Sequence, residues 1–158
     1  MQTTVAIATI ALIVHSLSAV VWVGGMFFAH QILRPAALAL EPGPRFELWD
    51  RVLSRFFSWV IAAIVLILAS GFAMVYGVFA GFPGIGLPID LMTGIGVVMM
   101  LIFFHVYFAP FRRFRRAVAR RDWAPASRQL AQIRVLVGIN LLLGLLTIAI
   151  ATSGPYWA

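Results

Sequence analysis

Four long apolar stretches, separated by short polar connections, organise the chain. Each has at least the ~20 residues that a helix needs to cross the ~30 Å hydrocarbon core of a bilayer. The stretches cover residues 5–33, 56–82, 87–111 and 133–153. Because a lipid-embedded backbone must satisfy its own hydrogen bonds, each stretch is predicted to be a helix. The pattern therefore predicts an all-α fold: a four-transmembrane-helix bundle in which residues 1–158 form a single membrane domain.

The composition excludes a soluble domain with a polar shell. Of the 158 residues, 63% are hydrophobic and only 11% are charged, far from the usage of ordinary globular domains. The chain has no cysteine, which removes disulfides, thiolate metal sites and cysteine nucleophiles together. Any redox chemistry, such as that of a membrane oxidoreductase, therefore needs a bound cofactor or metal.

The basic residues are all arginine, and they lie in two of the three connections. Four fall between the first two stretches, and eight fall between the last two or at the start of the fourth. By the positive-inside rule, connections 34–55 and 112–132 are predicted to be cytoplasmic and both termini to face the other side (N-out/C-out). This topology, in a bacterial inner membrane, accounts for the net charge of +7 without nucleic acid. It places the arginine cluster beside anionic lipid head groups.

The connections predict further short elements. The segment FELWDRVLSRFF has apolar residues near helical spacing and predicts a short helix lying on the membrane before residue 56. The segment FRRFRRAVARR predicts that the third span continues as an interfacial helix. Pro125-Ala126-Ser127 predicts a helix start before the fourth span, and residues 81–88 predict a tight turn.

Ionisable side chains inside a span are costly and are therefore the first functional candidates. Three histidines qualify: His15, His30 and His105. At 100° per residue, the polar residues of the first span gather on one face, which we expect to point into the bundle. That face comprises His15, Ser18, Ala19, Trp22, Met26, Ala29, His30 and Leu33. The same geometry groups Asp90, Gly94, Val98, Leu101, His105 and Arg112 on the third span, and it predicts that His105 also faces inward.

Depth in the membrane suggests which histidines can cooperate. His30 lies ~6 Å along its helix from Arg34 and His105 lies ~10 Å from Arg112, whereas His15 is ~28 Å from Arg34. His30 and His105 therefore share a level and are predicted to be axial ligands of a b-type haem, with arginines near its propionates. Asn140, at a similar depth, would orient a ligand histidine. The alternative is that His30 is an interfacial residue and His105 a packed one.

Two other functions compete with haem binding. A copper-transporting protein without haem would use His15, Met26 and His30 as successive ligands on one helix face, since histidine and thioether suit copper. Met99 and Met100 point roughly 120–140° away from His105 on the helical wheel, so they do not extend such a path. An accessory subunit would instead pack its polar face within a homo-oligomer or larger membrane complex.

The segment HSLSAVVWVGGMFF, residues 15–28, resembles the first span of the copper-resistance CopD-type membrane proteins and of the related HemJ-type protoporphyrinogen oxidases. The similarity extends to LWDRVLSRFF and to Phe104-His105-Val106-Tyr107 followed by basic residues. The resemblance implies a four-span inner-membrane protein associated with haem or copper, in which His15 matches the family's first-span histidine. The lysine of the HemJ pattern is missing early in the third span, where Asp90-Leu91-Met92-Thr93-Gly94 stands, and this departure argues against protoporphyrinogen oxidation.

Overall fold

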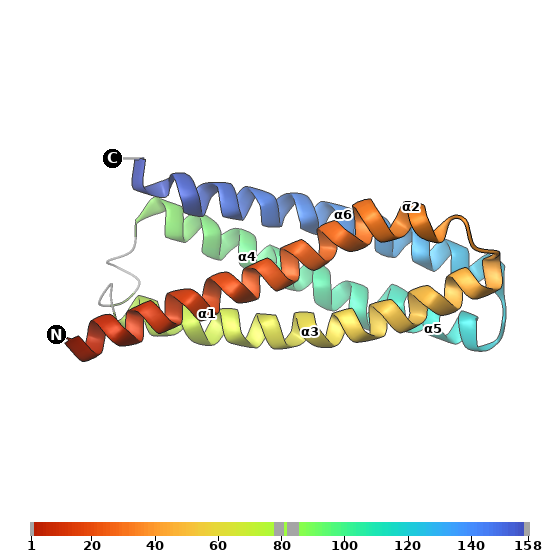
Figure 1. Cartoon of the computed structure of the whole chain (residues 1–158), viewed down its shortest axis with the longest axis horizontal. Coiled ribbons are helices and arrows are strands. Elements are labelled where there is room, and N and C mark those ends of the chain that lie inside the picture. Colours follow the sequence, from red (N-terminus) through yellow and green to blue (C-terminus); the bar gives the residue numbers. More distant parts are fainter. Residues whose placement is uncertain (1, 78–80, 82–85, 157–158) are drawn as a thin grey trace.

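Four long helical rods, packed side by side, form the molecule (Figure 1). The computed structural model describes residues 2–77, 81 and 86–156. In chain order, its helices are α1 (Gln2–Phe27), η1 (Phe28–Leu33), α2 (Arg34–Ala37), α3 (Pro42–Gly77), α4 (Leu87–Val106), η3 (Tyr107–Phe111), α5 (Arg112–Ala119), α6 (Trp123–Ser153) and η4 (Gly154–Tyr156).

The prediction of an all-α, four-span bundle is confirmed. Four continuous helical stretches are long and apolar enough to cross a membrane: Thr4–Ala37, Pro42–Gly77, Leu87–Ala119 and Trp123–Ser153. The start of α1 and the end of α6 lie at the same end of the bundle, and α2 and α5 lie at the other (Figure 1). We call this second end the arginine-rich end, because Arg34, Arg45 and the arginines of α5 lie there.

Two helix boundaries differ from the prediction. The separate helix expected on the membrane surface before residue 56 is absent from the described chain, because α3 runs unbroken from Pro42. Its first turns bury Phe46, Trp49 and Leu53 against the bundle, so the inner apolar face simply continues into the span. Helix α6 likewise begins at Trp123, before the predicted start, and Pro125 is accommodated in its first turn. Residues 82–85 of the predicted turn lie outside the described residues.

The first and third rods each change helical pitch near the arginine-rich end. A π-helical turn, η1, precedes Pro35, and a second, η3, contains Pro110. A proline ring clashes with the carbonyl four residues earlier in a regular α-helix, and a wider turn is one way to relieve that clash. Arg34 accordingly donates its backbone N–H to the carbonyl of Ala29, five residues back. The helix therefore continues past both prolines, and α5 extends the third rod as predicted.

Aromatic side chains fill the centre of the bundle. α1 packs mainly against α3, and α4 mainly against α6. Phe57 of α3 meets the ring of Phe103 at a centroid distance of 5.5 Å and that of Phe111 at 4.8 Å. Trp22 of α1 meets Phe103 at 6.2 Å, edge to face. These contacts join all but the α6 rod through rings that prefer such edge-to-face geometry.

Candidate functional site: the inward face of α1

His15 is held by two oxygen atoms of α3. Its Nδ1 lies 3.2 Å from the carbonyl oxygen of Ile67 and 3.1 Å from Oγ of Ser70. The Ser70 hydroxyl itself donates to the carbonyl of Leu66 at 2.6 Å, so its oxygen is the acceptor toward His15. Because a carbonyl can only accept, Nδ1 carries the proton and donates to both oxygens. In the neutral ring, Nε2 then has a free lone pair.

This arrangement is the one that metal-binding histidines use. A ligand histidine usually donates its second ring N–H to a carbonyl or carboxylate, which fixes the tautomer and the ring orientation. Ile67 and Ser70 supply that support to His15 from a neighbouring helix. Gly71 lies beside the ring, where a Cβ would be in van der Waals contact at 3.5 Å from Cε1 of His15. In His15 the nitrogen without a hydrogen-bond partner is therefore Nε2.

The predicted inward face of α1 is confirmed. Ser18, Trp22 and Met26 are buried, with Trp22 only 3% and Met26 only 2% exposed. Ser18 satisfies its own hydroxyl by donating to the carbonyl of Val14 at 2.7 Å, which leaves no hydroxyl proton for another acceptor. The Met26 thioether, by contrast, lies in the centre of the bundle, beside a small cavity.

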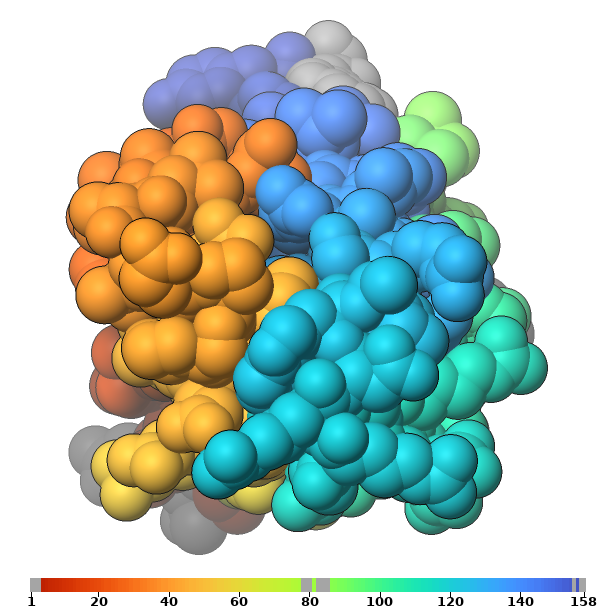
Figure 2. Space-filling model, turned by 90° about the vertical axis from the view of Figure 1, so that its right-hand side faces the viewer, coloured from red at the N-terminus to blue at the C-terminus, as the bar shows by residue number. Residues whose placement is uncertain are grey.

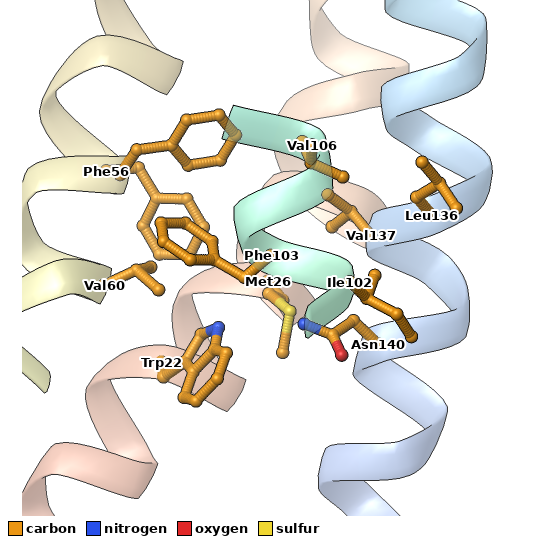
Figure 3. Close-up of a pocket in the computed structure, with 11 residues that line it drawn as sticks. Trp22, Met26, Phe56, Val60, Ile102, Phe103, Val106, Leu136, Val137 and Asn140 are labelled. Atoms are coloured by element: carbon orange, nitrogen blue, oxygen red, sulfur yellow. The ribbon is translucent and has the colours of Figure 1, made fainter. Parts of the chain in front are cut away.

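Asn140 borders the same cavity from α6. Its Nδ2 donates to the carbonyl oxygen of Met99 at 3.3 Å, while its Oδ1 is buried and has no hydrogen-bond partner. Exchanging the two amide atoms would set two oxygens against each other, so this orientation is the favourable one. Figure 3 shows Met26 and Asn140 together on the cavity wall, near Trp22 and Phe103. Asn140 and the Met26 thioether therefore line one central space, which has room for about one water molecule.

His105 does not face inward, which corrects the prediction. It is exposed on the outer surface of α4, together with Val98 and Leu101, the latter 64% exposed. α4 instead buries the opposite side, where Met99, Phe103 and Val106 pack into the core. Helices in a bilayer associate through close van der Waals packing, and on this side Phe103 makes ring contacts with Trp22 and Phe57.

His30 lies between α1 and α6 rather than near His105. Its ring packs against the backbone of α6, since a Cβ at Gly138 would lie 3.3 Å from Cε1 of His30. It shares a small pocket with Arg134. The bis-histidine haem pair is thus not assembled within one chain, and the residues present do not fit it. In residues 2–77, 81 and 86–156, no group of three or more His, Cys, Asp or Glu side chains is placed to hold a metal ion.

Sequence reasoning missed Ser70, which supports His15. The signal was available: Ser70-Gly71 is a small, polar interruption in an otherwise apolar span. The second span runs antiparallel to the first, so counting residues back from its outer end would have placed Ser70 at a depth close to that of His15. Asn140 was predicted to orient a ligand histidine, but its hydrogen-bond partner is the Met99 backbone.

Comparison with known proteins concerns mainly the last three rods. No curated protein and no solved structure matches the chain. A family model described as Copper resistance protein D (CopD) matches residues 50–153. The matched region contains Ser70, His105 and Asn140, whereas His15, Met26 and His30 precede it. Because the match covers well over half of its length, the chain belongs to the CopD family.

Proposed function

We propose that this multi-pass membrane protein handles copper as its substrate, with His15 as the first ligand. The observation that carries the proposal is the pair of hydrogen bonds from Nδ1 of His15 to Ile67 and Ser70. They leave Nε2 as a lone-pair donor inside a span, where an ionisable side chain is by default a functional candidate. Membership of a family described by copper resistance is consistent with copper as the ion.

Met26 is the second ligand in this proposal. It lies on the same inward face of α1, about 16 Å further along the helix axis, and its thioether selects Cu(I) over harder ions. Asn140, whose Oδ1 is buried without a hydrogen-bond partner, lines the cavity beside Met26. Because that cavity is small, the ion would pass between ligands by local rearrangement rather than through an open pore. His30 is not assigned to this path, for reasons of charge given below.

The test uses the detergent-purified protein and Cu(I) in competition with a chromogenic Cu(I) chelator. His15→Ala is expected to weaken Cu(I) binding at least about tenfold, the effect typical of losing a metal ligand or its support. His105→Ala is the matched control, because it also removes one imidazole but from the exposed surface of α4. Equal Cu(I) binding by the two variants would contradict the proposal.

Binding of b-type haem is the alternative that the sequence suggested. Within one chain it would have to rely on His30 without His105. A bis-histidine site would otherwise need histidines of two chains. A reduced-minus-oxidised visible spectrum of the same preparation separates the alternatives. A sharp b-type band that His105→Ala abolishes would replace the copper proposal with a haem site formed between chains.

A further inference from the structure

A second polar site lies at the arginine-rich end of the bundle. Here a pocket is bounded by η1, by the first half of α3 and by the first half of α6. Its walls are mostly apolar and include Trp49, Leu53 and Phe56 of α3, while His30 and Arg134 supply the polar groups. Figure 2 views this end, with the orange segment of α2 and early α3 on one side and α5 with early α6 on the other.

Arg134 is the unusual residue of this pocket. Its Nε is buried and has no hydrogen-bond acceptor. A guanidinium donor without an acceptor is costly to bury, and proteins normally pair it with a carboxylate or phosphate. In the part of the chain that the structure describes, the recorded ion pair joins Arg115 to Asp50, and none involves Arg134.

The charges around Arg134 add to the cost of leaving its guanidinium without an acceptor. Arg34 and Arg45 are the charged neighbours that act on it, and both carry the same sign. The His30 side chain, which shares the pocket, makes no hydrogen bond to any of the described residues. Arg134 therefore has two like-charged neighbours and shares its pocket with an unpaired imidazole, and among the described residues no ion pair to it is found. Such a field repels a copper cation and attracts an anion.

We propose that this pocket binds an oxyanion of the phosphate class, held by the guanidinium of Arg134 and the imidazole of His30. The arginine fork matches phosphate oxygens in a bidentate manner. The charges of Arg34 and Arg45 add to the positive field at Arg134, and the apolar wall suits the chain of a phospholipid whose phosphate is the bound group. Neither His15 nor Met26 lines this pocket, so the proposal stands whether or not copper is the substrate.

Two sources of phosphate are tested separately on delipidated protein. Native mass spectrometry with added phosphatidylglycerol or phosphatidylcholine measures lipid binding. The shift of Tm in sodium phosphate, compared with sodium chloride of equal ionic strength, measures binding of the free anion. Arg134→Gln is expected to reduce binding about tenfold for whichever ligand the unmodified protein binds, the phospholipid or the free phosphate. Arg113→Gln is the control, because it makes the same change in charge at a residue that is exposed on α5.

Each outcome decides the proposal. Retention of phosphatidylglycerol that is lost in Arg134→Gln but kept in Arg113→Gln supports a lipid phosphate. A phosphate-specific Tm shift with the same pattern supports a soluble anion. Equal behaviour of the two variants in both assays overturns the site. If Arg134→Gln does not fold, two other variants are tested instead: His30→Ala, and Arg134→Lys, which keeps the charge but removes the planar guanidinium. Unchanged binding of phosphate by both variants would also overturn the proposal.

Discussion

At the scale of single residues, the chemistry of His15 is decided by its neighbours on α3. The carbonyl of Ile67 and the Oγ of Ser70 both accept from Nδ1, and this fixes which nitrogen can bind a metal. Periodicity identified His15 as an inward-facing ionisable residue, but it could not assign a tautomer. That assignment needs the partner atoms, which come from a helix more than fifty residues away.

Removing the serine hydroxyl tests this orientation. We expect Ser70→Ala to lower Cu(I) affinity about tenfold, within the range seen when the partner of a ligand histidine is lost. The Ile67 carbonyl would still accept from Nδ1, so the effect should be smaller than that of His15→Ala. The measurement is chelator competition on the purified protein.

Ser58→Ala is the matched control for this experiment. Ser58 lies on the same helix, is exposed, and donates only to the carbonyl of Ser54 one turn earlier. Its loss should leave Cu(I) affinity unchanged. If Ser70→Ala binds Cu(I) as tightly as Ser58→Ala does, the serine plays no part in orienting the histidine.

At the scale of helices, the sequence predicted which segments are helical better than it predicted how they face. Length and apolarity determine the existence of the four rods. The inward face of α1 was found because its polar residues cluster on one side. α4 is apolar on nearly all sides, so its few polar residues did not indicate which side faces the core. In the structure Met99 and Phe103 are buried and His105 is exposed. A separate surface helix was predicted before residue 56, but the amphipathic turns that begin at Pro42 and the apolar turns that follow form one continuous helix, α3.

Close packing of α6 against α1 gives a prediction at this scale. A Cβ at Gly144 would lie 2.7 Å from Cγ2 of Val23 and 3.2 Å from Cε of Met99. Met99 is flexible, but Val23 is buried and stiff at χ1. Gly144→Ala should therefore destabilise the protein by about 1–3 kcal/mol, the usual cost of overpacking.

The control for Gly144 is another helical glycine that has free space. At Gly94 a Cβ would meet nothing within 4 Å, so Gly94→Ala should raise stability slightly, by up to about 1 kcal/mol, through helix propensity. Thermal unfolding in one detergent, followed by circular dichroism, compares the two variants. A Tm for Gly144→Ala at or above that of the unmodified protein would show that the two helices separate easily.

At the scale of the whole molecule, charge separates the two ends of the bundle. The arginines of α2, α3 and α5 surround one end, where Phe46 stacks on Trp123 at 5.8 Å and ties α3 to α6. At the other end, the described part of the chain carries Asp90 and no arginine. This asymmetry makes the two membrane surfaces inequivalent, and it predicts the orientation of the chain, because arginine-rich connections stay in the cytoplasm.

The absence of cysteine makes this orientation directly measurable. Single cysteines can be introduced at two exposed positions, Arg113→Cys at the arginine-rich end and Tyr156→Cys at the opposite end, where the tyrosine is 85% exposed. A membrane-impermeant maleimide added to intact cells should label Tyr156→Cys and spare Arg113→Cys, and inside-out vesicles should reverse the pattern. Because the oxyanion pocket opens at the arginine-rich end, the same labelling locates it. The opposite labelling pattern would put His15, rather than the arginines, on the cytoplasmic side, and copper would then meet its first ligand from within the cell.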